Sequence, residues 1–299
     1  MKDKTISLVL GSGGARGLAH IGVIKYLSEQ QYKIGSIVGC SIGALVGGVY
    51  AGGKIDELEE WMLNLKKTDM VKLMDFSWGM NGFIKGDKVI SELEAFIGNK
   101  DIEDLDIPFT AIAADIKTEK EVWICSGGLF EAIRASVSLP LFLTPVSKDG
   151  KLLIDGGVLN PVPIAPAFKD GFDTIVAVNL GGVPDPDIHT AEKQRSIQPN
   201  QDEGLFRKIS TYVSNIIDSK KKDGEEEEGY GMYDIADRAF DIMQNAIARQ
   251  KLAAYTPDVL IEIPRNACGT LEFDKAEEMI KMGYDKAKKA FSDKSEQSN

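Results

Sequence analysis

The sequence predicts an α/β fold with a mainly parallel central sheet, because short apolar runs alternate with segments of helical spacing. Residues 5–10 and 34–38 are apolar runs that end in glycines, which is typical of buried strands. Residues 18–29 follow the first run with apolar side chains spaced along one helical face, and residues 42–50 follow the second with many small residues. Repeated strand–turn–helix units favour a parallel sheet covered by helices.

The remaining segments continue this alternation. Further strands are expected at 108–114, 152–154, 174–180 and 259–263, and further helices at 56–65, 87–96, 128–135, 234–252 and 275–291.

At 299 residues the chain lies near the upper limit for one hydrophobic core, so we predict a single domain over residues 1–292. Its core is expected at about 5–182, followed by a connector with an amphipathic helix at 183–230. The helices and strand within 231–292 are expected to pack back on the core, and residues 293–299 form a polar tail.

Composition and charge narrow the classes of function. The 43% apolar and 27% charged residues are typical of a soluble globular protein. A net charge of −11 argues against nucleic acid as a partner, because phosphates require a basic surface. Cys40, Cys125 and Cys268 share no ligand spacing and fit reduced thiols better than disulfides or a zinc site. No cofactor is expected. No apolar run has the length of a signal-peptide core or a membrane span, and we predict a cytoplasmic protein.

A candidate nucleophile lies in the Gly-Cys-Ser-Ile-Gly sequence of residues 39–43. A nucleophilic serine needs a turn at the end of a strand that is too tight for flanking side chains, and Gly39 and Gly43 meet that need around Ser41. The helix that follows would direct its N-terminal amides at the reacting centre. The alternative interpretation is a strand–helix turn in which the serine only caps the helix.

A glycine-rich loop occupies residues 11–17, Gly-Ser-Gly-Gly-Ala-Arg-Gly. It lacks the Gly-x-Gly-x-x-Gly spacing and the later acidic residue of a dinucleotide site, and it lacks the Gly-Lys-Ser/Thr of a phosphate loop. The interpretation that remains is an oxyanion hole, in which backbone amides converge on a developing negative charge. Arg16 adds a positive charge there, or else makes a structural ion pair or a hydrogen bond to a loop carbonyl.

A candidate base stands in Asp155-Gly156-Gly157, where two glycines allow a sharp turn after a short strand. Burial of the Asp155 carboxyl would raise its pKa toward working pH. The alternatives are an ordinary Asp-Gly-Gly turn and a Ser41–Asp155–His189 triad, although His189 stands in an acidic loop typical of solvated residues. The order of the three motifs predicts a serine hydrolase with a Ser41–Asp155 dyad.

Together these motifs resemble the signatures of one family. Residues 13–17, 39–43 and 155–157 are similar to the three motifs of patatin-like phospholipases, in particular the compact bacterial members. Residues 135–140 and 144–146 resemble the segment that precedes the aspartate in that family. The resemblance covers about residues 5–180.

This resemblance implies a patatin-like three-layer α/β/α sandwich and a dyad of Ser41 and Asp155, with no catalytic histidine and no metal. It implies phospholipids, lysophospholipids or similar lipid esters as substrates. It also implies oxyanion donors among the amides of Gly13, Gly14, Ala15 and Arg16. An acyltransferase that uses the same acyl-enzyme, or a regulatory protein with an inherited site, is the alternative function.

Apolar segments without helical or strand period are candidates for an acyl-chain channel, with roofing of the core as the alternative. The candidate lining residues are Met74, Phe76, Trp78, Phe83, Leu141 and Phe142. A separate apolar stripe at 205–217 fits a core-facing helix best; a homodimer contact and peripheral contact with a membrane are the alternatives.

Overall fold

The computed structural model describes residues 4–65, 87–140, 142–188 and 232–297. Two compact units are present: Met1–Pro184 with Met243–Asn299, and Asp185–Ile242. The sheet and the helices packed on it belong to the first unit, and helix α10 (Met232–Ala254) begins in the second and ends in the first. The single domain over residues 1–292 stays a prediction.

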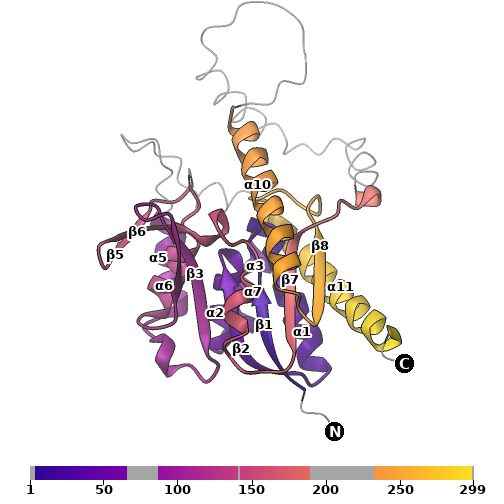
Figure 1. Cartoon of the computed structure of the whole chain (residues 1–299). Helices are drawn as coiled ribbons and strands as arrows, with labels where there is room; N and C mark the ends of the chain where they lie inside the picture. The colour runs from indigo at the N-terminus through magenta and orange to yellow at the C-terminus, as the bar shows by residue number, and fades with distance from the viewer. Residues whose placement is uncertain (1–3, 66–86, 141, 189–231, 298–299) are drawn as a thin grey trace, which may run out of the picture. The chain divides into compact units, whose positions relative to one another are not determined.

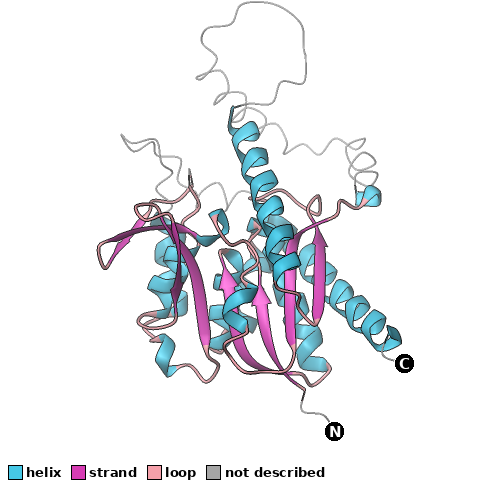
Figure 2. Cartoon of the chain, in the orientation of Figure 1, coloured by secondary structure: helices cyan, strands magenta, loops and turns pink. Residues whose placement is uncertain are grey.

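One mixed sheet forms the centre of the first unit (Figures 1 and 2). Its strands in the described residues are β1 (Thr5–Leu10), β2 (Lys33–Cys40), β3 (Phe109–Asp115), β4 (Lys120–Ile124), β5 (Val146–Lys148), β6 (Lys151–Asp155), β7 (Ile175–Gly182) and β8 (Val259–Pro264). Successive hydrogen-bonded neighbours are β5-β6-β3-β2-β1-β7-β8, β4 is also paired to β3, and β6 and β2 pair with different residues of β3. The neighbours β3, β2, β1, β7 and β8 are parallel to one another, whereas β4 and β6 pair antiparallel with β3, and β5 pairs antiparallel with β6.

Helices cover both faces of the sheet (Figure 2). They are α1 (Ala19–Glu29), α2 (Ile42–Ala51), α3 (Ile55–Asn64), α5 (Asp87–Ile97), α6 (Leu129–Ser136), α7 (Ile164–Ala167), α10 and α11 (Ala276–Gln297), with 3-10 turns η1 (Gly14–Leu18), η2 (Ile102–Asp104), η3 (Gly156–Val158) and η4 (Phe273–Lys275). The α/β/α layering confirms the predicted fold class.

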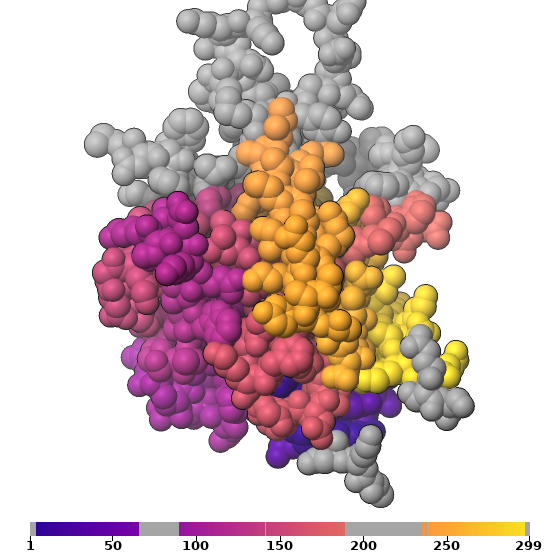
Figure 3. All heavy atoms as spheres, in the orientation of Figure 1, coloured from indigo at the N-terminus to yellow at the C-terminus, as the bar shows by residue number. Residues whose placement is uncertain are grey.

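Side-chain alternation along the strands divides the core between the two faces. On one face, Val9, Val38 and Ile112 pack in a buried cluster with α7 and with Ala248 of α10. The C-terminal part of α10, orange in Figure 3, covers this side of the molecule. On the other face, α2 lies so close that a Cβ at Gly47 would meet the Ile37 side chain at 2.7 Å.

Strand β3 brings two distant segments to the same place. Cys40 of β2 is paired with Ile112 in parallel register, and Asp155 of β6 is paired with the next residue, Ala113, in antiparallel register. Because β4 pairs with both Ile112 and Ala113 on the opposite edge, β2 and β6 share one edge of β3. The end of β6 therefore meets the end of β2, which places Asp155 beside the residue that follows Cys40.

Most of the predicted elements are present, with three differences. The predicted helix at 18–29 is preceded by the 3-10 turn η1, so that α1 begins at Ala19. Strands β4 and β5 and the short helix α7 were not predicted. Helix α11 continues to Gln297, into the predicted polar tail. Its apolar face packs on α1, and its exposed last turns extend the same helix.

Helices α1 and α11 cross at Gly22 and Gly283, and this crossing gives a first test of the fold. A Cβ added to Gly283 would approach the Ala19 carbonyl carbon at 2.6 Å and its Cα at 2.8 Å, and backbone cannot yield as a side chain can. We expect Gly283→Ala to lower the free energy of unfolding by roughly 1–3 kcal/mol, the usual range for overpacking.

Chemical denaturation measures this effect, with Gly269→Ala as the matched control, since a Cβ there meets nothing closer than 3.4 Å. Equal stability of the two variants would show that α1 and α11 do not cross at Gly283.

Candidate active site

The turn after β2 presents Ser41 in an unusual backbone conformation. Ser41 has φ 55° and ψ −125°, a left-handed value that non-glycine residues adopt only where their surroundings impose it. The collisions that a Cβ would make show why glycines flank it: at Gly39 it would meet the Ala44 backbone at 2.6 Å, and at Gly43 it would overlap the Leu10 carbonyl. The hydroxyl makes no capping bond to α2, so the helix-cap interpretation does not hold.

The Ser41 hydroxyl instead donates a short hydrogen bond to Asp155 Oδ2 across 114 residues of sequence. Ser41 is buried and Asp155 is fully buried, so both polar groups depend on each other and on the protein for hydrogen bonds. The other carboxylate oxygen, Oδ1, accepts from the Gly157 N–H at 2.7 Å, which is the local turn bond expected of Asp-Gly-Gly. The candidate nucleophile and base predicted from the sequence are therefore in contact.

Burial controls the protonation of Asp155. Loss of water around the carboxyl group raises its pKa from 3.8 to about 6, and the hydrogen bonds from Ser41 and Gly157 partly oppose that rise. Asp155 is then ionised at neutral pH and has a pKa close enough to neutrality to accept and return a proton.

The glycine loop begins where β1 ends, next to the Ser41 turn, because Leu10 is paired with Gly39. Gly14 has φ +58°, and a Cβ there would collide with the Thr270 carbonyl, so the loop requires glycine at this position. Ala15 donates its N–H to that same carbonyl at 2.9 Å, which removes one of the four predicted oxyanion donors. The Gly13 and Gly14 amides stand at the start of η1, where a helix has no internal partners for its N–H groups.

Arg16 holds this loop in shape. Its side chain is buried, and it donates from Nε to the Gly13 carbonyl at 3.0 Å and from one terminal nitrogen to the Arg265 carbonyl at 2.9 Å. The structure thus matches the alternative in which the guanidinium bonds a loop carbonyl.

His20 also braces the loop. It is fully buried, donates from Nε2 to the Gly11 carbonyl at 2.9 Å, and burial lowers its pKa to about 4 against the opposing effect of that bond. It is therefore neutral at physiological pH.

Comparison with known proteins decides the family. The family model described as patatin-like phospholipase matches residues 8–168, which include Ser41 and Asp155. An NTE family protein of Mycobacterium tuberculosis strain H37Rv is 34% identical over 93% of this chain and 89% of its own length. This chain belongs to the patatin-like phospholipase family. It is accordingly a lipid ester hydrolase.

Other relatives share only a domain with this family member. The human patatin-like phospholipase domain-containing protein 6 is 32% identical over 64% of this chain and 14% of its own length. The lysophospholipase NTE1 of Cryptococcus neoformans is 34% identical over 60% of this chain and 11% of its own length. The crystal structure of VipD from Legionella pneumophila has the same fold, with a TM-score of 0.57, 13% identity, and coverage of 98% of this chain and 67% of VipD.

Two side chains that the sequence did not single out contact the patatin-like site. Ser136, at the end of α6, accepts the Ser41 N–H at 2.9 Å. Gln244, buried on α10, donates to Ser12 Oγ in the glycine loop at 3.2 Å, and a Cβ at Gly157 would overlap the Gln244 side chain. Ser136 lies in a segment already noted for its family resemblance; nothing in the local pattern around Gln244 marks it.

Cys40 adjoins Ser41 in sequence but does not compete with it. The thiol is fully buried, and burial raises its pKa well above the usual range, with the Asp155 and Glu121 charges adding to the effect. It therefore stays protonated, and the thiolate that nucleophilic attack requires does not form.

Several predictions fall outside the described residues. These are the acyl-channel candidates Met74, Phe76, Trp78, Phe83 and Leu141, the triad candidate His189, and the apolar stripe at 205–217. Phe142 is described and is partly exposed. The acyl channel, the triad and the role of the stripe stay predictions.

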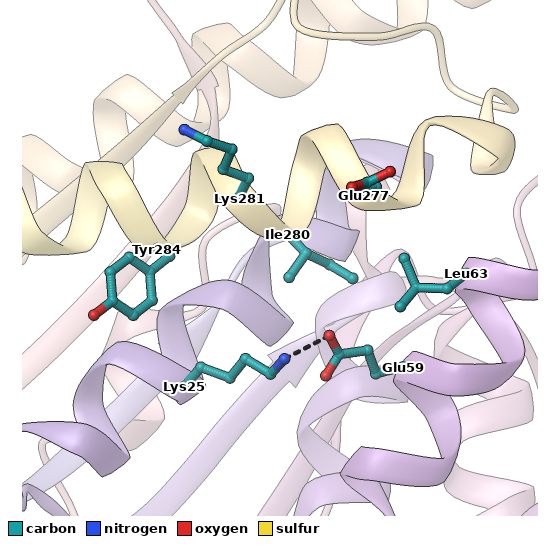
Figure 4. A pocket seen from close by; sticks show the side chains of 7 residues that line it. All are labelled: Lys25, Glu59, Leu63, Glu277, Ile280, Lys281 and Tyr284. Atoms are coloured by element: carbon teal, nitrogen blue, oxygen red, sulfur yellow. Dashed lines mark hydrogen bonds and ion pairs between the residues drawn. The ribbon is translucent and has the colours of Figure 1, made fainter.

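A pocket of about 590 Å³ opens between α1, α3 and α11 (Figure 4). Two ion pairs involve its lining residues: Lys25 lies 2.5 Å from Glu59, and Lys281 lies 2.7 Å from Asp285. None of the predicted site residues that the structure describes lines it. Among the described helices, none is both long and apolar enough to cross a bilayer.

Proposed function

We propose that this chain cleaves lipid acyl esters through Ser41 as nucleophile and Asp155 as base. The observation that carries the proposal is the buried hydrogen bond from the Ser41 hydroxyl to the Asp155 carboxylate, on a strained turn beside a glycine-rich loop. A serine hydroxyl is a weak nucleophile until a neighbouring base accepts its proton. Asp155 is in place to accept it without a histidine between the two.

The reaction proceeds in two halves. As Ser41 Oγ attacks the ester carbonyl, its proton moves to Asp155 Oδ2, and the alcohol leaves with that proton as the tetrahedral intermediate collapses to an acyl-enzyme. Water then attacks the acyl carbon while Asp155 takes one of its protons. The second tetrahedral intermediate collapses, the bond from the acyl carbon to Ser41 Oγ breaks, the fatty acid leaves, and Asp155 returns the proton to Ser41 Oγ. Because the pKa of Asp155 lies at about 6, the carboxyl can serve as base and acid in turn near neutral pH.

Backbone amides stabilise the oxyanion in both halves. Gly13 and Gly14 supply the donors, since their N–H groups open η1 and the Ala15 N–H is bonded to Thr270. Each donor of this kind contributes roughly 2.7–4 kcal/mol to transition-state stability. The bonds from Arg16 and His20 to loop carbonyls keep the amides in place before substrate arrives.

The substrate class follows from the relatives. Their names include a lysophospholipase and patatin-like phospholipase domain-containing proteins, and the matching family model covers both Ser41 and Asp155. We propose a phospholipid or lysophospholipid as the ester. Peripheral contact with a lipid surface and a homodimer stay predictions.

A panel of lipids assayed with the wild type and Ser41→Ala side by side tests the proposal. We expect the wild type to release free fatty acid from at least one phospholipid or lysophospholipid, and a fluorophosphonate probe to label it at Ser41. Added glycerol or lysolipid reveals acyl transfer if a new ester appears in place of the fatty acid. A wild type that releases no acyl group and takes no label would refute the proposed chemistry.

A further inference from the structure

The end of α6 contacts both partners of the dyad. Ser136, the last residue of α6, accepts a hydrogen bond from the Ser41 N–H at 2.9 Å. Two residues later, the Ser138 carbonyl accepts a hydrogen bond from the Asp155 N–H at 2.9 Å. The main chain of Ser41 and that of Asp155 are therefore held by the same three-residue segment.

The Ser136 hydroxyl acts as a bridge at the point where β2 leaves the sheet. It also donates to the Ile112 carbonyl at 2.6 Å, and Ile112 is the residue of β3 paired with Cys40. The hydroxyl thus links a strand carbonyl to the amide of the first residue beyond the strand. Ser136 is fully buried, so water does not replace it in either bond.

This bridge matters because Ser41 has a conformation that its own sequence disfavours. A left-handed φ in a residue with a Cβ persists only where surrounding contacts fix it. The hydrogen bond to Ser136 holds the Ser41 nitrogen, one of the atoms that define φ. The close backbone packing around Gly39 and Gly43 restrains the turn on either side.

The segment itself is held rigid. Arg134 donates to Ser138 Oγ at 2.5 Å and to the Thr144 carbonyl at 2.9 Å, and Ser138 Oγ donates back to the Arg134 carbonyl at 2.7 Å. The Arg134 guanidinium therefore links Ser138 to Thr144, and the Ser138 hydroxyl ties the end of the segment back to the Arg134 main chain.

We propose that Ser136 is a positioning residue, whose hydroxyl holds the Ser41 main chain so that the Ser41 hydroxyl meets Asp155. The inference rests on the proposed function, since it assigns Ser136 to the alignment of that nucleophile. A merely structural role would affect folding alone. Alignment would affect the rate at which Ser41 reacts.

Ser136→Ala tests this, with Ser7→Ala as the matched control. Ser7 is an equally buried serine whose hydroxyl is bonded to Ser36 Oγ at 2.9 Å within the sheet, and its loss leaves one buried group unpaired without touching the dyad. We expect Ser136→Ala to lower kcat/KM roughly 10- to 100-fold through kcat, the loss associated with displacing a reacting group by about 1 Å. Fluorophosphonate labelling of Ser41 should slow by a similar factor.

The pH profile gives an independent measure. Donation from Ser41 lowers the pKa of Asp155, so a weakened Ser41–Asp155 bond should move the acid limb of activity upward from about 6. Ser7→Ala should keep its labelling rate within about twofold of wild type and the same acid limb in its pH profile. Its melting temperature should fall, as that of Ser136→Ala should, because each variant loses a buried hydrogen bond. If Ser136→Ala does not fold, Ser136→Cys keeps a weaker donor and acceptor at this position and should give a smaller loss in the same direction.

Equal labelling rates and acid limbs for Ser136→Ala and Ser7→Ala would overturn the inference while leaving the proposed function intact. A wild type that neither turns over esters nor takes label would overturn both.

Discussion

Ser41→Ala should abolish measurable ester turnover, and Asp155→Asn should reduce it by about 10⁴-fold or more. In serine proteases, removal of the nucleophilic serine lowers kcat by about 10⁶-fold, and removal of the acidic residue of the triad lowers it by about 10⁴-fold. Here Asp155 contacts the nucleophile directly, so its amide replacement removes the only carboxylate hydrogen-bonded to the Ser41 hydroxyl in the described residues. Steady-state release of fatty acid from the best lipid of the panel measures both effects.

Matched controls separate chemistry from folding. Ser36→Ala removes a buried hydroxyl of β2 that is bonded only within the sheet, and Asp115→Asn removes a buried carboxylate of β3 that is bonded to Thr118 and to the Leu152 N–H. Both should retain most of the activity of the folded protein. The double variant of Ser41 and Asp155 should be no worse than Ser41→Ala, because the two residues act as one unit.

His189→Ala separates a dyad from a triad. We expect most of the turnover to remain, because Asp155 is bonded to Ser41 without an intervening imidazole. A loss as large as that of Asp155→Asn would establish the Ser41–Asp155–His189 order instead.

The turn at Ser41 and the fold class were predictable because their signals are local. A glycine on each side of Ser41 directly reflects the space that the turn leaves, and apolar runs that alternate with helical periods indicate a parallel sheet. The meeting of Ser41 and Asp155 depends on register, since β6 must share an edge of β3 with β2. No local pattern states that register; the prediction that the two residues meet came from the combination of motifs.

The hairpin that contains strand β5 has a local sequence signal. Asp149 and Gly150 have φ 50° and 77° and connect Lys148 to Lys151 in a two-residue hairpin, for which Asp-Gly is a typical sequence. The contacts of Ser136 and Gln244 had no such signal, because a buried serine and a helical glutamine have ordinary local sequences. Their partners are set by helix packing over 95 and 232 residues of separation.

Two buried groups should give opposite contributions to stability between pH 6.5 and 4, and this is the second large effect that we expect. The folded pKa of Asp155 is raised from 3.8 to about 6, because burial disfavours the carboxylate. Above pH 6 the Asp155 carboxyl is ionised in both the folded and the unfolded chain, and the cost of burying that charge lowers the stability of the folded state. As the pH falls toward 4, the folded chain binds a proton that the unfolded chain does not, so Asp155 adds stability. The span corresponds to about 3 kcal/mol.

His20 works in the other direction. Burial lowers its folded pKa from 6.5 to about 4, so the unfolded chain binds the proton first as the pH falls, and up to about 3 kcal/mol of stability is lost over the same interval. Other carboxyl groups titrate alike in wild type and variants, so they cancel when stabilities are compared at each pH.

Urea denaturation of wild type, Asp155→Asn and His20→Gln from pH 8 to pH 4.5 tests both signs. We expect Asp155→Asn to be more stable than wild type at pH 8, by up to about 3 kcal/mol, with the difference shrinking as the pH falls. The deficit of His20→Gln at pH 8 should shrink over the same range, because the variant has no imidazole to protonate. An Asp155→Asn protein that is less stable than wild type at pH 8 would mean that the hydrogen bonds to the carboxylate outweigh its burial, and that Asp155 titrates below the range a proton acceptor near neutrality requires. Greater stability together with lost turnover would show that the fold bears a buried charge at this position because the reaction needs it.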